Sequence, residues 1–360
     1  MAHQTGQTGK LAATWEEDAA AIAAHELPWE KLSGCRIAVT GAGGFLGGYL
    51  VRTLLALHRL GKVEQPVEVV AMVRNLGRAQ AVFADELAGG GLSLFEWDLN
   101  AIAVPALGAV HYVLHAASQA SPRFYGTDPV GTLLPNTVGT AGLLEALRAS
   151  PDPRGFLFVS SSEVYGAVSS KDSLAESDYG TVDPATVRAC YAESKRMGET
   201  MCVAWQQQHG IPAYIVRPFH TYGPGLTAND GRVFADFSFN VVRGENIVMN
   251  SDGSARRAFC YASDAVAGFF SVLLKGAAGQ AYNVANPAGE LSVMELAELL
   301  VGLFPEKGLQ VERRVPVDAK AYLQSTYNRL VPDVSRLEAL GWKAVVAPGQ
   351  GFRRMILAHG

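Results

Sequence analysis

The chain of 360 residues is 49% hydrophobic and 18% charged, with a formal net charge of -4 at pH 7 and a pI near 6.1. This length can bury the core of one large or two modest domains, and the composition is that of a soluble globular protein. The slightly acidic balance excludes the basic surface of a nucleic-acid-binding protein, and no apolar run reaches the about 18 residues that suggest a membrane span.

The amino terminus reads as an extension, 1–33, ahead of the main fold. Residues 1–11 are polar and rich in Gly, Gln and Thr, which predicts disorder, whereas 12–32 carry an Ala-rich helical pattern broken at Pro28. The first residues lack a charged start followed by an apolar segment, and the four cysteines show no CxxC spacing. We therefore expect a reducing, cytoplasmic setting.

From Arg36 onward the chain alternates strand-like and helical patterns. Strands are predicted at 36–40, 67–73, 92–97, 109–117 and 155–161. The alternation predicts an α/β fold, a Rossmann-type doubly wound parallel sheet that binds ligands over the carboxyl ends of its strands. After Arg217 the pattern becomes irregular in RPFHTYGPG, then helical and mixed. This predicts a cofactor-binding domain at 34–216 and a smaller carboxyl-terminal α/β substrate-binding domain at 217–360, some of whose segments return to the first.

A glycine-rich turn follows the first predicted strand and opens a helix. Gly41, Gly44 and Gly47 carry the spacing, and Phe45 and Leu46 lie between them. Glycine allows a tight turn, lets backbone N–H groups approach a pyrophosphate and permits close helix packing, while the helix N-terminus adds partial positive charge. The turn predicts a bound dinucleotide, NAD or NADP; a glycine turn without a ligand is the alternative.

The residues after the second and third strands bear on the choice of cofactor. An NAD site usually offers an acidic residue after the second strand, but this chain has Arg74, Asn75 and Arg78. Arginine suits a 2′-phosphate and so favours NADP; an arginine that stacks on the adenine of NAD is the competing interpretation. Asp98, after the third strand, is predicted to reach the adenine end. No metal is expected, because His111 and His115, although four apart, flank a strand-like run.

Tyr191 and Lys195 are four residues apart and so share one face of a predicted helix. A nearby cation favours the phenolate and lowers a tyrosine pKa. Such a tyrosine can take a proton from a sugar hydroxyl while a hydride leaves to nicotinamide. A YxxxK pair alone is usually a surface coincidence, but this one follows a glycine turn and a strand that ends in the serines of SSSEVYG (160–166).

Together these motifs resemble a known family. TGAGGFLG, HAAS (115–118), NTVGT (136–140), SSSEVYG, YAESK, RPFHTYGPG, NDGRVFADF (229–237), RRAFCYASD (256–264) and PDVSRLEALGW (332–342) span most of the chain. The chain resembles an extended short-chain dehydrogenase/reductase of the nucleotide-sugar epimerase, dehydratase and decarboxylase group. TYGPG, NDGRVFADF and RAFCY are most similar to UDP-glucuronate decarboxylases.

The resemblance implies a reaction through a 4-keto sugar. Ser161 would assist Tyr191, and Ser162-Glu163 matches the Ser-Glu of decarboxylases, where 4,6-dehydratases carry Asp-Glu. Arg257 in RAFCY suits a substrate carboxylate, since a guanidinium can hold two oxygens at once. After oxidation at C4 the β-keto acid would lose carbon dioxide, Glu163 or a water it holds would assist reprotonation of C5, and the recycled cofactor would stay bound.

The resemblance also implies binding residues and partners. The implied cofactor set is Gly41, Gly44, Phe45, Leu46, Gly47, Arg74, Asn75, Arg78, Asp98, Leu99, Ala116, Ala117, Ser118, Tyr191, Lys195 and Pro218, and the implied substrate set is His220, Tyr222, Arg232, Val233 and Arg257. The expected ligand is a nucleotide-diphosphate sugar, most simply a UDP sugar. A homodimer is expected through helices near 136–149 and 187–208.

Two departures keep other activities open. Decarboxylases typically have Asn where this chain has His220, and an acidic residue where it has Arg74. A nucleotide-sugar 4-epimerase needs Ser161, Tyr191 and Lys195 but not Glu163, and a 4,6-dehydratase uses the same scaffold. Less favoured are an NADP-linked carbonyl reductase, which NDGRVFADF and RRAFCY do not suit, and a non-catalytic nucleotide-binding member. His220 and Arg232 could also be an ordinary loop histidine and a solvated helix start.

Overall fold

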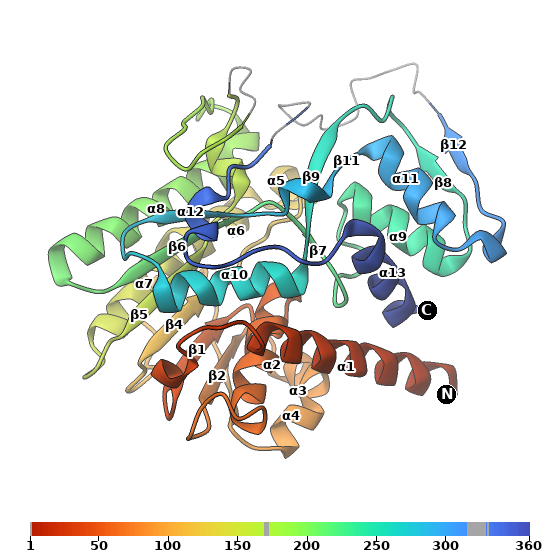
Figure 1. Ribbon diagram of the computed structural model, residues 1–360. Helices are drawn as coiled ribbons and strands as arrows, with labels where there is room; N and C mark the ends of the chain where they lie inside the picture. The colour runs from red at the N-terminus through yellow and green to blue at the C-terminus, as the bar shows by residue number, and fades with distance from the viewer. Residues whose placement is uncertain (1, 169–172, 315–328, 330) are drawn as a thin grey trace.

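The computed structural model describes residues 2–168, 173–314, 329 and 331–360. A parallel sheet forms its centre, in the order β10-β6-β5-β4-β1-β2-β3 (Figure 1). Its strands are β1 Arg36–Thr40, β2 Glu68–Val73, β3 Leu92–Glu96, β4 Tyr112–His115, β5 Gly155–Val159, β6 Ala213–Pro218 and β10 Ala281–Val284. Strands are added on one side of β1 up to β3 and then on its other side from β4 onward, which makes the sheet doubly wound and confirms the predicted fold class.

Both faces of this sheet are covered, which explains its nearly continuous apolar strands. In β5, Leu157 and Val159 pack on one face, and Phe156 and Phe158 on the other. The first face carries helices α2 Phe45–Arg59 and α10 Ala262–Lys275. The second carries α7 Val138–Arg148 and α8 Cys190–His209, with α6 Pro129–Asn136 packed on α8. Smaller helices are α3 Leu76–Val82, α4 Ala84–Ala88 and α5 Arg123–Thr127.

A second group of elements has its own apolar core, and we call it the carboxyl-terminal layer. It contains the small sheets β11-β9-β7 and β12-β8 and helices α9, α11 and α13 (Figure 1). Their bounds are β7 His220–Tyr222, β8 Ile247–Met249, β9 Arg256–Tyr261, β11 Glu290–Ser292, β12 Val311–Arg313, α9 Val233–Arg243, α11 Val293–Gly302 and α13 Pro348–His359; α12 is Ser335–Glu338.

The expectation of an irregular RPFHTYGPG segment is wrong in part. His220–Tyr222 forms strand β7, because its backbone pairs with β9 in the register His220↔Phe259. This pairing joins residues that are far apart in the sequence, so the local sequence pattern does not indicate the strand. It places His220 beside the strand that carries Arg257.

The predicted disorder of 1–11 is also wrong for the described residues: helix α1 runs Ala2–Ala23, and Met1 lies outside the described part of the chain. The later turns of α1 pack on α2, α10 and α13 (Figure 1). Once those turns are fixed, adding further helical residues needs no new nucleus, so the polar start continues the helix.

Asp18 anchors α1 to three other elements. Its carboxylate is 2% exposed and accepts hydrogen bonds from Tyr49 (2.8 Å) and Tyr261 (2.9 Å), and Arg354 lies 2.9 Å away. These partners belong to α2, β9 and α13. Burial raises the pKa of Asp18, against the hydrogen bonds that favour its ionised form. The extension is therefore built into the fold.

We expect Asp18→Ala to lower the free energy of unfolding by about 3 kcal/mol, because it removes the acceptor of the buried Tyr49 and Tyr261 hydroxyls and one of the two carboxylates that pair with Arg354. Glu17→Ala is the matched control, since Glu17 also pairs with Arg354 (3.0 Å) but is largely exposed. Urea unfolding measures both. Equal losses for the two variants would contradict the anchoring role of Asp18.

No helix in the described part of the chain is long and apolar enough to cross a membrane. All four cysteines are buried free thiols. His111 and His115 both make hydrogen bonds to strand β1. His111 Nδ1 accepts from the Arg36 backbone N–H (3.0 Å), and the His115 ring is hydrogen-bonded to the Thr40 hydroxyl (2.7 Å) and to the Pro135 carbonyl (3.0 Å).

Candidate active site

The glycine turn has the geometry of a phosphate cradle. Gly41 has φ +64°, and a Cβ placed on it would lie 2.8 Å from Ala117 Cα. A Cβ on Gly47 would lie 2.1 Å from the Gly41 carbonyl oxygen. Both positions therefore require glycine. A Cβ on Gly43, at the outer side of the turn, meets nothing within 4 Å. The turn thus leaves open space at the N-terminus of α2, where backbone N–H groups favour an anion.

The carboxyl end of β2 brings the predicted adenosine-side residues beside this turn. Arg74 is exposed one residue beyond β2, whose Met72 pairs with Thr40 of β1. Asn75 caps helix α3, its side-chain oxygen accepting from the backbone N–H of Arg78 at 2.8 Å. Asp98 is exposed and accepts from the backbone N–H of Asn100 (3.0 Å). Arg74 and Asp98 are thus exposed, whereas Asn75 caps α3.

The floor of the cofactor region comes from the end of β4. The backbone N–H of Ala117 donates to the Thr40 hydroxyl at 3.1 Å, which holds Ala116–Ser118 against the glycine turn. Leu99 is buried and would be 2.9 Å from a Cβ on Gly139 of α7. Pro218 ends β6 on the same edge of the sheet. Ala117 therefore lies against the glycine turn, and Leu99 packs against α7.

Tyr191 and Lys195 lie on the first turns of α8, as the spacing predicted. Burial raises the pKa of Tyr191 to about 12, while the hydroxyls of Ser161 and Ser118 favour the phenolate. Lys195 is 2% exposed; its Nζ donates to the Val159 carbonyl (2.6 Å) and lies 5.8 Å from the centre of the Tyr191 ring. Burial lowers the pKa of Lys195 to about 7. Burial thus outweighs these hydroxyls at Tyr191, whose pKa is raised and not lowered as the neighbouring cation had suggested, and it brings the pKa of Lys195 close to neutral pH.

The three serines after β5 have separate tasks. Ser160 donates to Glu199 of α8. Ser161 caps the short helix η2 Ser162–Tyr165 by accepting from the backbone N–H of Glu163 (3.2 Å), and its hydroxyl also faces Tyr191. Ser162 is buried at 6% exposure.

Glu163 is held near Tyr191 by two residues that sequence reasoning missed. Arg188 pairs with the Glu163 carboxylate at 3.0 Å, and its guanidinium lies 4.9 Å over the ring of Tyr125. That ring stacks on Tyr191, with centroids 5.1 Å apart and planes 16° apart. Arg188 is one turn before Tyr191, a spacing that could have indicated it. Tyr125 lies on α5, and no local pattern marks it.

The other side of the site is cationic. Arg232 directly precedes α9 and makes a bidentate pair with Asp230, from Nε (2.5 Å) and Nη2 (2.8 Å), and its charge also favours the Tyr191 phenolate. Arg257 of β9 is 9% exposed and donates to the Arg256 carbonyl (2.7 Å). Burial, with Arg257 and Arg232, lowers the pKa of His220 to about 3, so the imidazole is neutral.

The other two predicted substrate residues, Tyr222 and Val233, contribute no charge to the site. Tyr222 is fully buried; its ring stacks on Phe352 at 3.8 Å and its hydroxyl donates to the Pro348 carbonyl (3.3 Å). Its place is the core of the carboxyl-terminal layer. Val233 is half-buried and opens α9, so it can contribute backbone and apolar surface beside Arg232.

The residues present fit a dinucleotide and a polar second ligand. The glycine turn is the cradle that a Cβ would fill, and it follows β1 at the same edge of the sheet where Lys195 contacts Val159, the last residue of β5. Nδ1 of His220 and Oγ of Ser121 are buried atoms without a hydrogen-bond partner among the described residues. A buried polar atom without a hydrogen bond lowers the stability of the fold unless a ligand or a water molecule bonds to it.

Comparison with known proteins agrees with this geometry. Residues 37–285 match the NAD dependent epimerase/dehydratase family. The chain is 34% identical over 329 residues to UDP-glucuronic acid decarboxylase 6 of Arabidopsis thaliana, covering 90% of this chain and 88% of that one. It is 32% identical over 322 residues to UDP-glucuronic acid decarboxylase 1 of Xenopus tropicalis, covering 89% and 71%.

A solved structure shares the fold. It is the dTDP-glucose 4,6-dehydratase DesIV from Streptomyces venezuelae with NAD and TYD bound, with a TM-score of 0.75, 24% identity, and coverage of 90% of this chain and 96% of that one. The family that the sequence motifs predicted is confirmed. The chain belongs to the NAD-dependent epimerase/dehydratase family of enzymes.

Proposed function

We propose that the protein decarboxylates a UDP-hexuronate, best UDP-glucuronate, through a 4-keto intermediate. The observation that carries the proposal is the pair Ser162-Glu163 behind Tyr191: a buried hydroxyl and a carboxylate held by Arg188. A dehydratase needs an acid at the first of these positions, and serine is a poor one. The relatives named UDP-glucuronic acid decarboxylases support the same choice.

The residues of the chain supply the proton transfers. Tyr191 takes the proton of the 4-hydroxyl, with Ser161 and Arg232 favouring its phenolate. When bound, the nicotinamide supplies the acceptor for the C4 hydride and later returns it. A C4 ketone is β to the C6 carboxylate, so the C5–C6 bond breaks as carbon dioxide leaves and its electrons form an enolate. Glu163, or a water it holds, delivers a proton to C5, and Tyr191 returns its proton to the C4 oxygen.

Arg257 is proposed to hold the C6 carboxylate. We expect Arg257→Lys to reduce kcat/KM for UDP-glucuronate about tenfold to a hundredfold, because a lysine cannot make the bidentate pair. Binding of UDP-glucose, which lacks the carboxylate, should change far less. Arg256→Lys is the control, since Arg256 is the neighbouring residue on β9 but pairs with Glu295 at 3.1 Å. Steady-state kinetics and calorimetry measure the effects, and equal losses for both sugars would contradict this role.

A 4-epimerase is the second candidate. It would use Ser161, Tyr191 and Lys195 and leave Glu163 without a task, and epimerases are among the similar solved folds. Incubation with UDP-glucuronate separates the two. A decarboxylase gives a product lighter by one carbon dioxide, and an epimerase gives a product of unchanged mass.

The finer assignments belong to the same proposal. Exposed Arg74 favours NADP, which a direct comparison of NAD and NADP affinity tests. Residues 34–216 and 217–360 would serve the cofactor and the nucleotide sugar, and the protein would work in the cytoplasm. A homodimer would use the helices near 136–149 and 187–208, where Met197 (49% exposed) and Val203 (46%) of α8 are exposed apolar residues, and light scattering in solution would detect it.

A further inference from the structure

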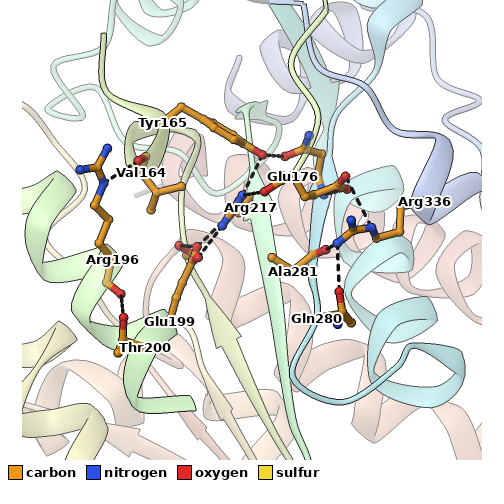
Figure 2. A network of polar contacts seen from close by, with 12 residues as sticks. Val164, Tyr165, Glu176, Arg196, Glu199, Thr200, Arg217, Gln280, Ala281 and Arg336 are labelled. Carbon is orange, nitrogen blue, oxygen red and sulfur yellow. Dashed lines mark hydrogen bonds and ion pairs between the residues drawn. The ribbon is translucent and has the colours of Figure 1, made fainter. Parts of the chain in front are cut away.

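A buried ion pair lies one helical turn beyond Lys195. Glu199 of α8 receives two bonds from Arg217 at the end of β6, from Nη2 to Oε2 (2.6 Å) and from Nε to Oε1 (2.9 Å) (Figure 2). The side chains are 12% and 4% exposed. Ser160, directly after β5, donates to the same carboxylate. This cluster therefore fastens α8 to the carboxyl ends of two neighbouring strands.

The same guanidinium reaches the turn that carries Glu163. Arg217 Nη1 donates to the Tyr165 hydroxyl and to the Glu176 carbonyl, both at 3.0 Å, and its Cζ lies 4.9 Å over the Tyr165 ring (Figure 2). Tyr165 ends η2, the short helix that starts at Ser162. One buried arginine thus contacts the elements that hold Lys195 and Glu163.

Glu199 is an anion near Lys195, and its charge favours the ammonium. Glu199 follows it by four residues and so lies on the same face of α8. The other titratable groups around Lys195 are His115 of β4, which its charge affects, and Tyr191 and Cys202 of α8. Phe158 of β5 contributes a ring 4.9 Å from Nζ. Burial lowers the pKa of Lys195 and the Glu199 charge raises it, so Glu199 offsets part of the cost of a buried ammonium.

We propose that Glu199 and Arg217 are positioning residues of the catalytic site: they hold α8 and the Glu163 turn in register and set the charge environment of the Lys195 ammonium. Arg217 neutralises much of the charge of the Glu199 carboxylate. The carboxylate then stabilises the Lys195 ammonium without drawing that ammonium away from Tyr191. A purely structural ion pair would fasten the same elements but leave the protonation of Lys195 unchanged when its charges are altered with the fold intact.

The test follows Lys195 directly and needs no substrate. In protein labelled with ¹³C at lysine Cε, NMR gives the titration midpoint of Lys195, assigned by the signal lost in Lys195→Met. Glu199→Gln keeps the shape of the side chain and still accepts from Arg217. We expect it to lower the midpoint by about one unit or more, because the anion is gone and the buried arginine remains. Glu193→Gln, on the same helix and paired with Arg196 at 3.2 Å, should leave it unchanged.

Arg217→Gln should shift the midpoint the other way, because the Glu199 charge is then unopposed. If that variant does not fold, the double variant Glu199→Gln with Arg217→Gln replaces it, because this variant leaves neither charge unpaired. The Lys195 midpoint in the double variant should lie above the midpoint in Glu199→Gln. A folded Glu199→Gln protein with the wild-type midpoint would overturn the proposal. The NMR titration needs no turnover, so its result does not depend on whether the protein is a decarboxylase. Only the catalytic role of Glu199 and Arg217 rests on the proposed function.

Discussion

Tyr191→Phe is expected to lower kcat about a thousandfold while cofactor affinity stays within about twofold of the wild type. The substitution removes the oxygen that exchanges a proton with the 4-hydroxyl, and little else. The ring should keep its stacking on Tyr125, since its neighbours are unchanged. Product formation from UDP-glucuronate and calorimetric binding of NAD measure the two effects.

The control for this variant is Tyr179→Phe, because Tyr179 is 76% exposed. It should retain wild-type turnover. Near-normal turnover by Tyr191→Phe, with the protein folded and the cofactor bound, would remove the tyrosine from the mechanism.

Glu163→Gln should lower kcat about a hundredfold, because an amide cannot pass a proton to C5 or hold the water that does so. The loss should fall on reprotonation, so that turnover in D₂O gives mixed C5 stereochemistry in the remaining product. NMR of that product and the rate of its formation are the measurements. The Glu193→Gln variant is again the control, since that carboxylate is partly exposed and pairs with Arg196.

This variant also separates the candidate reactions. A 4-epimerase has no task for Glu163, so turnover would then remain close to normal. A hundredfold loss together with retained NAD binding supports decarboxylation, whereas an unaffected kcat would count against it.

The sequence indicated the parts of the site that depend on local geometry. The glycine turn required Gly41 and Gly47, and the structure places atoms where their Cβ would be. Tyr191 and Lys195 needed only the period of a helix. The strand ending in serines was also visible, although β5 stops at Val159 rather than continuing through Ser161.

What the sequence did not indicate depends on contacts between distant segments. Tyr125 stacks on Tyr191, which follows it by 66 positions, and Arg217 of β6 donates to the carbonyl of Glu176, which precedes it by 41 positions. Tyr222 belongs to the TYGPG segment, yet its ring packs on Phe352 near the carboxyl terminus and lies in the core of the carboxyl-terminal layer. The sequence pattern indicated a helix near the amino terminus, but it did not indicate that Asp18 is buried. That burial depends on contacts with Tyr49, Tyr261 and Arg354, which lie far along the chain.

The most direct test of the proposed activity is to incubate the purified protein with UDP-glucuronate and follow the nucleotide product by mass spectrometry and NMR. UDP-glucose and UDP-N-acetylglucosamine serve as parallel substrates. We expect a UDP-pentose, lighter than the substrate by one carbon dioxide, with no net consumption of cofactor. A product of unchanged mass with an inverted C4 centre, or a stoichiometric loss of reduced cofactor, would contradict it.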